Sequence, residues 1–121
     1  MISLLNTNPM ASFTENFLAP QAGATELSIP ILMYHEIAPP ERVEAIAQKT
    51  QRSFIVTIEQ FETQMQWLVD NGFRAVTLAD LPQILSGTRP RRPGEKPVII
   101  TFDDGFAGNY FHAFPVLRRL N

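Results

Sequence analysis

Two carboxylates stand side by side in this sequence, directly after an apolar run. The run is "VIITF", residues 98–102, and Asp103, Asp104 and Gly105 follow it. Two adjacent ionised carboxylates repel one another, and the apolar residues before them offer few polar partners. A divalent cation would offset that repulsion, because carboxylate oxygens are ligands of such ions. One carboxylate could then bind the ion while its neighbour accepts a proton from the bound water.

The surroundings of the pair decide between a chemical site and an ordinary turn. Side chains alternate along a strand, so Asp103 and Asp104 reach one site only if the backbone turns sharply, which Gly105 permits. Asp-Gly is also a common turn pair, and the bare motif fits a simple turn equally well. The buried strand before it favours a site, because ligands of parallel α/β folds bind at the carboxyl ends of strands.

The rest of the sequence predicts a parallel α/β fold that would position this pair. Strands are expected over 27–37, 73–78 and 98–102, and helices over 57–72, 77–87 and from 109 onward, the last with Pro115 in its first turn. Such alternation is typical of a parallel sheet wrapped by helices. Residues 38–54 are predicted to be a surface loop. Residues 1–26 are predicted to be a poorly ordered leader, which leaves 27–121 as the domain.

The clearest predicted helix is the segment 57–72. Thr57 with Gln60 forms a capping box at its start, and Asn71 with Gly72 supplies the left-handed stop. Apolar residues recur between them at helical spacing, namely Ile58, Phe61, Met65, Leu68 and Val69. Trp67 lies on this helix, and we interpret it as packed against the sheet rather than stacked on a sugar.

Composition narrows the classes of protein and of site. The chain has 121 residues, 45% of them hydrophobic, which suits one small globular domain. Its net charge of -2 argues against a nucleic-acid partner. Cysteine is absent, so a metal would be held by oxygen and imidazole ligands. The N-terminus has no basic region and its apolar runs are broken by polar residues and proline, so we expect no signal peptide. No window approaches about 18 consecutive apolar residues, so we expect no transmembrane segment, and the compartment stays open.

Three segments resemble the polysaccharide deacetylase family, the NodB-homology domains of the carbohydrate esterases. They are "ILMYHEI", "FETQMQWLVDNGFRAVTLADL" and "PVIITFDDGF" followed by "NYFHAFPVLRRLN", in matching order and spacing. The match covers about residues 28–121 and the N-terminal half of the family's domain. It implies the N-terminal part of a distorted (β/α) barrel with parallel strands, incomplete in this chain. It also implies a hydrolase that removes N-acetyl, or O-acetyl, groups from a polysaccharide in carbohydrate metabolism, in a family often found secreted or in the cell envelope.

The resemblance assigns roles to individual residues. Asp103 would be the general base, and Asp104 would bind a divalent metal, most often zinc. Tyr34 and His35 match the family's "YH" and would lie beneath the site, although His35 is equally well explained as a strand-end residue.

The sequence departs from the family where the metal site should be completed. The family uses two further histidines, spaced H-x-x-x-H, together with an arginine motif and a catalytic acid histidine. The histidines here are His35 and His112, too far apart to be that pair, and we interpret His112 as a packing or surface residue. The expectation is that a zinc site needs a missing C-terminal half or a partner chain. In such a fragment the strand 98–102 would keep an unpaired apolar edge.

Two other functions are kept as alternatives. The chain could be a catalytically inactive, truncated fragment that only binds carbohydrate or protein. It could also be a phosphoryl-transfer receiver domain, which the acidic strand end fits but the remaining segments do not. The arginines of the connection 88–97, Arg89, Arg91 and Arg92, are interpreted as a solvated loop.

Overall fold

The computed structural model describes residues 9–18, 28–46 and 49–120, and its strands are all parallel. Strands β1 (Ile31–Tyr34), β4 (Phe73–Val76) and β5 (Lys96–Phe102) form one sheet in the order β1-β5-β4. Strands β2 (Glu36–Ala38) and β3 (Ile55–Thr57) form a second, two-stranded sheet. No barrel closes within the described ranges. The predicted α/β class, with parallel strands and an incomplete barrel, is therefore confirmed.

Strand β5 is the centre of the larger sheet. Phe102 pairs with Tyr34 of β1 on one edge, and Ile99 pairs with Val76 of β4 on the other. The expectation that 98–102 keeps an unpaired edge is therefore wrong, because the free edges belong to β1 and β4. Val98 is 1% exposed, as its position in the middle of the sheet requires.

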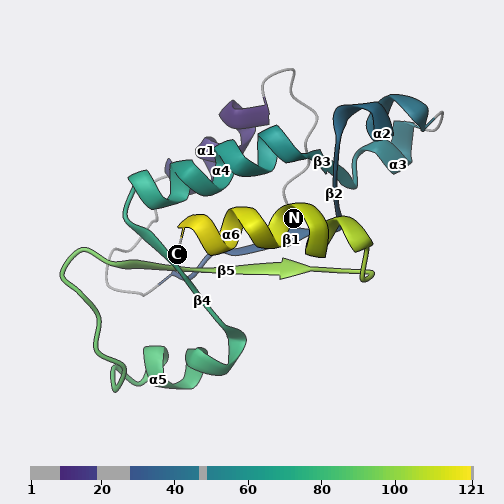
Figure 1. Ribbon diagram of the computed structural model, residues 1–121. Coiled ribbons are helices and arrows are strands. Elements are labelled where there is room, and N and C mark those ends of the chain that lie inside the picture. The colour runs from purple at the N-terminus through teal and green to yellow at the C-terminus, as the bar shows by residue number, and fades with distance from the viewer. Residues whose placement is uncertain (1–8, 19–27, 47–48, 121) are drawn as a thin grey trace.

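Helices cover both faces of this sheet (Figure 1). Helices α4 (Ile58–Asp70) and α6 (Phe114–Leu120) lie over one face, and the short helix α5 (Leu81–Leu85) lies on the other. Two clusters of buried side chains follow from this arrangement. The larger includes Phe61 and Val98, and the smaller joins Ile84 to Ile99. No helix in the described parts of the chain combines the length and apolar composition needed to cross a membrane.

The capping predicted for α4 is present in full. The Thr57 hydroxyl accepts from Gln60 N–H, and the Gln60 side chain accepts from Thr57 N–H. After the helix, Gly72 has φ 79°, the left-handed conformation of a helix stop. Because these signals are local in sequence, both ends of α4 were predictable.

A second capping arrangement begins the short helical stretch of η1 (Leu78–Asp80) and α5. The backbone N–H and the hydroxyl of Thr77 both donate to Asp80 Oδ2 at 2.8 Å. These two hydrogen bonds to the ionised form lower the pKa of the Asp80 carboxyl below its usual range. Gly87 then ends the stretch with φ 72°, as predicted.

The segment 38–54 is more ordered than the predicted surface loop. It contains α2 (Pro40–Ala45) and α3 (Lys49–Arg52), and strand β3 follows at once. The expected strand 27–37 is also divided, because β1 stops at Tyr34 and β2 pairs with β3 instead. Three-residue strands have no periodicity to detect, and their pairing depends on residues about 20 positions apart.

The last helix begins earlier than predicted. Helical backbone runs from 107 to 120, and a π-helical turn, η2 (Asn109–Ala113), precedes α6. Phe114 N–H donates to Asn109 O, five residues back. Pro115 is thus inside the helix and not in its first turn. Its ring would clash with the carbonyl of Phe111 in a regular α-helix, and the wider turn immediately before it accommodates the ring.

Helix α1 (Pro9–Leu18) lies inside the segment predicted to be a poorly ordered leader. Phe13 on this helix is 2% exposed, and its ring packs edge-on against Trp67 at 5.8 Å. Trp67 also stacks on Phe73 at 6.1 Å, so it is partly buried as interpreted from the sequence. Other residues of 1–26, and the predicted boundary at 27, lie outside the described residues.

A buried hydrogen bond joins β1 to α4. The Tyr34 hydroxyl donates to Gln64 Oε1 at 2.7 Å, and both residues are buried. The Tyr34 ring also packs edge-on against Phe61 at 5.1 Å and stacks on Phe102 at 5.8 Å. Burial raises the pKa of the Tyr34 phenol well above its usual range, so the hydroxyl stays a donor.

We expect Tyr34→Phe to lower the free energy of unfolding by about 1–3 kcal/mol, because it leaves Gln64 Oε1 buried without its donor. Urea denaturation followed by circular dichroism measures the change. Tyr110→Phe is the matched control: Tyr110 is 68% exposed, and its variant should stay within about 0.5 kcal/mol of the parent. Tyr34→Phe combined with Gln64→Leu should recover much of the loss. Equal stability of the two single tyrosine variants would contradict the role of this bond.

Candidate functional site

The two aspartates lie where β5 leaves the sheet, beside the end of β1. Asp103 is partly buried, and its backbone N–H donates to Tyr34 O at 2.8 Å. Asp104 and Gly105 follow with φ 65° and 63°, two successive residues in the left-handed region. The sharp turn expected at Gly105 is present. It starts one residue earlier, at Asp104, in a conformation that Asp adopts more readily than most residues other than glycine.

The residue that follows the acidic turn (residues 103–108) is hydrogen-bonded to His35, next to the end of β1. Asn109 Nδ2 donates to His35 O at 2.9 Å, and Asn109 N–H donates to Phe106 O at 3.0 Å. The turn therefore begins and ends on consecutive carbonyls of the chain, those of Tyr34 and His35. The sequence analysis missed Asn109, because its partner is 74 residues away and no local pattern indicates the bond.

Asn109 has one further polar atom that bears on the site. Its Oδ1 is buried and has no hydrogen-bond partner among the residues that the structure describes. Because Nδ2 is committed to His35 O, this oxygen remains an acceptor beside the acidic turn.

Gly108 allows the helix after the turn to approach β2 closely. A Cβ atom on Gly108 would lie 2.0 Å from Ile37 O and 3.2 Å from Ile37 C. Both are backbone atoms, so only glycine fits without a shift of the main chain. The sequence carried no signal for this approach, because the helix was predicted to begin at 109 and Gly108 therefore lay outside it.

Tyr34 and His35 lie at the end of β1, next to the turn. The Tyr34 hydroxyl is already bonded to Gln64, so it supports the strand end from below and does not point into the turn. His35 is half-buried, and its ring packs against Phe54 with 4.9 Å between centroids. Its carbonyl, bonded to Asn109, is the part of His35 that touches the turn segment.

The remaining candidates lie away from the aspartates or pack in the fold. His112 is half-buried on the π-helical turn, with its Cδ2 3.5 Å from the Cβ position of Gly108, as a packing residue would be. Arg89 pairs with Asp80 at 3.7 Å, whereas Arg91 and Arg92 are exposed.

The donor set fits only part of a zinc site. Such a site ordinarily has three or more protein ligands. Within the described ranges there is no group of three histidine, cysteine, aspartate or glutamate side chains able to hold one ion. Asp103 and Asp104 offer carboxylate oxygens at the end of β5, and two adjacent carboxylates alone do not make up such a ligand set.

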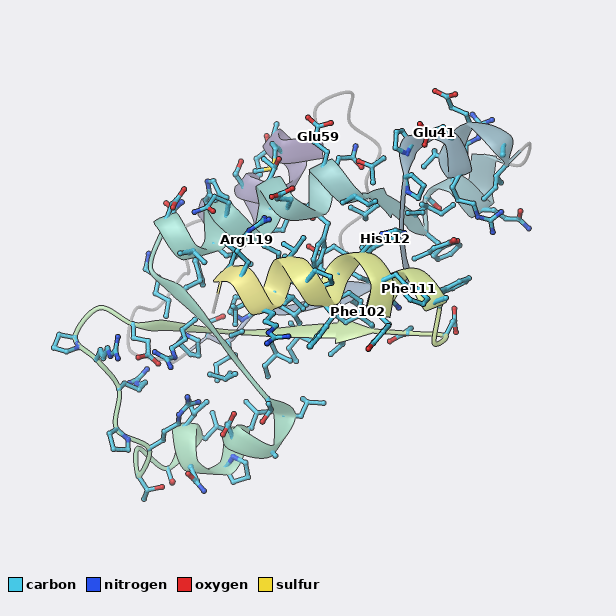
Figure 2. The ribbon with its side chains drawn as sticks, viewed as in Figure 1. Glu41, Glu59, Phe102, Phe111, His112 and Arg119 are labelled. Carbon is cyan, nitrogen blue, oxygen red and sulfur yellow. The ribbon has the colours of Figure 1, made fainter. Side chains whose placement is uncertain are left out.

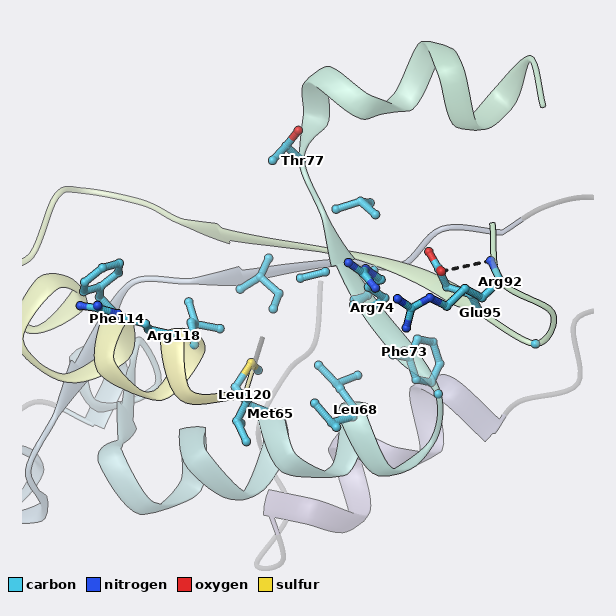
Figure 3. Close-up of a pocket in the computed structure, with 18 of the residues that line it drawn as sticks. Met65, Leu68, Phe73, Arg74, Thr77, Arg92, Glu95, Phe114, Arg118 and Leu120 are labelled. Carbon is cyan, nitrogen blue, oxygen red and sulfur yellow. Dashed lines mark hydrogen bonds between the residues drawn. The ribbon is translucent and has the colours of Figure 1, made fainter. Parts of the chain in front are cut away.

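A separate groove of about 760 Å³ opens between α4, β4 and α6 (Figure 3). Its walls are mainly apolar and include Leu68, Phe73 and Leu120, with Arg74 and Arg118 at the surface. Asp103 and Asp104 do not line it. The groove is therefore distinct from the acidic turn.

Comparison with known proteins finds relatives over about three quarters of the chain. No protein-family model matches the chain. YxkH of Bacillus subtilis (strain 168), assigned by name to the polysaccharide deacetylases, is 40% identical over 91 residues, which are 75% of this chain and 28% of that protein. The poly-beta-1,6-N-acetyl-D-glucosamine N-deacetylase of Escherichia coli (strain K12) is 35% identical over 68 residues, 56% of this chain and 10% of that protein.

Solved structures agree with these relatives. The deacetylase PplD of Streptococcus pyogenes, in complex with acetate, superposes with a TM-score of 0.57 and 32% identity, over 76% of this chain and 38% of that one. IcaB from Ammonifex degensii gives 0.56 and 29%, over 78% and 35%. These relatives and solved structures support a partial polysaccharide deacetylase domain in this chain. The chain spans less than two fifths of each of these proteins.

Gly108→Ala tests the close approach that positions the acidic turn. In an ordinary helix interior this change stabilises by about 1 kcal/mol. Here we expect it to destabilise by about 1–3 kcal/mol, since the new methyl group would overlap the Ile37 carbonyl. Thermal and urea unfolding measure the sign. The neighbouring, exposed Ala107→Gly should cost no more than about 1 kcal/mol. A more stable Gly108→Ala variant would show that the helix does not rest on β2.

Proposed function

We propose that this chain contributes the general base and one metal ligand to a metal-dependent deacetylase acting on an acetylated polysaccharide. The observation that carries the proposal is the conformation of the acidic turn. Asp104 is held at φ 65° directly after the central strand, beside the partly buried Asp103. Two successive left-handed residues, Asp104 and Gly105, turn the chain sharply, which two adjacent carboxylates need in order to reach one site. Asp tolerates this conformation better than most residues other than glycine, so the turn is compatible with a carboxylate at this position.

Asp103 is the proposed general base. Its backbone N–H donates to Tyr34 O, which fixes the position of its Cα atom. From there its carboxylate would accept the proton of a water that attacks an acetamide carbonyl. Asp104 would hold a divalent cation, with zinc as the choice implied by the family. When bound, such an ion lowers the pKa of water and stabilises the developing oxyanion. Its other ligands would come from another segment or chain.

The substrate class follows from the relatives. One of them is named for removing acetyl groups from poly-beta-1,6-N-acetyl-D-glucosamine. We propose the N-acetyl group of an amino-sugar polymer as the substrate, with O-acetyl groups as the related chemistry. The reaction hydrolyses a carbon–nitrogen bond that is not a peptide bond, and it releases acetate and a free amine.

A binding role without catalysis is the second candidate. Two observations favour it: no complete metal-ligand group exists within the described residues, and the His35 ring packs against the Phe54 ring with 4.9 Å between centroids. In that case the acidic turn would be retained in a fragment that only binds carbohydrate or protein.

A chimera tests the proposed function directly. The matched 91-residue segment of YxkH is replaced by the corresponding segment of this chain, which supplies the acidic turn to a longer relative. We expect the chimera to release acetate from an N-acetylglucosamine oligosaccharide and a chelator to abolish the release. Asp103→Asn should lower the rate about 10²- to 10⁴-fold, the usual contribution of a general base. Asp104→Asn should weaken metal binding without unfolding, because Asn tolerates the left-handed conformation.

The control is Asp70→Asn, which removes an exposed carboxylate at the end of α4 and should leave the rate unchanged. An active Asp103→Asn chimera would refute the assignment of the base. A folded but inactive parent chimera would instead support the binding role.

A further inference from the structure

The groove between α4, β4 and α6 reaches the free edge of the larger sheet. Its lining includes the six consecutive residues 72–77, which are β4 with one residue before it and one after it. Side chains alternate between the two faces of a strand, so a groove on one face alone would meet every second residue. The groove therefore extends to the backbone edge of β4. Within the described residues that edge has no partner strand, because β4 ends the order β1-β5-β4.

The floor and the other walls of the groove are apolar. Val98 and Ile100 of β5 lie in it on the sheet face that α4 and α6 cover. Leu68 of α4 and Leu117 and Leu120 of α6 line it from the sides (Figure 3). A strand edge beside apolar walls suits an extended polypeptide, whose backbone pairs with the edge while every second side chain enters the groove.

Three exposed arginines without an ion pair line the same groove. Arg74 and Arg92 lie on its β4 side, and Arg118 lies on its α6 side (Figure 3). The salt bridges among the described residues involve other arginines. Arg119, for example, lies between α6 and α4 and pairs with a glutamate of α4 (Figure 2). Glu95 is the one acidic residue among the described residues of the lining, so three arginines and one glutamate leave two net positive charges.

These charges and the free edge decide between occupants. A second copy that paired through its own β4 would bring the arginines of both copies together, which like-charge repulsion opposes. The acyl chain of a fatty acid would cover the apolar walls but would leave the strand edge unpaired. A polypeptide strand with apolar side chains and a carboxylate on each flank would satisfy the edge, the walls and the arginines together.

We propose that the groove and the β4 edge are the docking surface for a strand from the part of a polysaccharide deacetylase domain that this chain does not span, and that carboxylates flank the apolar residues of that strand. The inference rests on the proposed function, in which another segment supplies the remaining metal ligands. The length of the relatives supports this source, since the chain covers 28% of YxkH and 38% of PplD. A strand added to β4 would extend the sheet that carries Asp103 and Asp104.

Peptide binding to the full chain tests the charge requirement. Two fluorescein-labelled peptides share a centre of alternating apolar residues, which glutamates flank in one peptide and lysines in the other. Fluorescence anisotropy should show about tenfold tighter binding of the glutamate peptide, weakening as salt is added. Arg74→Glu and Arg118→Glu should each weaken it about threefold to tenfold. Arg91→Glu is the matched control: Arg91 is exposed in the connection before β5 but does not line the groove, and its variant should bind as the parent does.

Hydrogen exchange in the chimera with YxkH tests the source of the strand. In the chimera the unmatched part of YxkH is covalently present. We expect the amides of 73–76 to exchange about tenfold more slowly there, relative to those of 98–101, than in this chain alone. The reference is suitable because β5 is paired on both edges in the chain by itself. If the chimera does not fold, the peptide comparison decides alone.

Three results would overturn the proposal. They are equal affinity for the two peptides, parent-like affinity in both groove variants, or an unchanged exchange ratio in a folded chimera. Displacement of the glutamate peptide by laurate at lower concentration would also overturn it, in favour of a fatty acid. Neither measurement depends on catalysis. Asp103→Asn should bind the glutamate peptide as the parent does, so an inactive chimera with a protected β4 would refute only the proposed reaction.

Discussion

The pairing of β5 on both of its edges is the constraint on which the rest of the structure depends. Neighbours on each side, β1 and β4, satisfy its backbone and fix where it ends. Residues of β5 alternate between two clusters, so Val98 faces α4 and α6 while Ile99 faces α5. The positions of the helices therefore follow from the position of one strand. Since parallel strands end at the same edge of a sheet, the acidic turn emerges beside the end of β1.

The acidic turn combines a sharp local change of chain direction with support from distant residues. Asp104 and Gly105 are two successive residues in the left-handed region. One end of the turn is bonded to Tyr34 O and the helix start after it is bonded to His35 O. Below these carbonyls, the Tyr34 side chain is anchored to Gln64 of α4. The segment that carries the two aspartates is therefore hydrogen-bonded on both sides to Tyr34 and His35.

The character of the surface changes around this turn. Beyond the two carboxylates lies an uncharged helix start with three exposed aromatic rings. The arginines of 88–97 belong to the segment that leads into the opposite end of β5, and Arg89 is partnered by Asp80.

The sequence by itself determined the features that local residue patterns encode. The capping box and the glycine stop of α4, the strand 98–102, the turn at Gly105 and the family resemblance could all be inferred from neighbouring residues. The tertiary structure decided which strands pair, and it placed β5 in the centre of the sheet. It also produced the short β2–β3 sheet, the π-helical turn before Pro115 and the contacts of Gly108, Asn109 and Gln64. Each of these depends on groups far apart in the chain, whose meeting is set by how the helices and strands pack and not by the spacing of residues along the sequence.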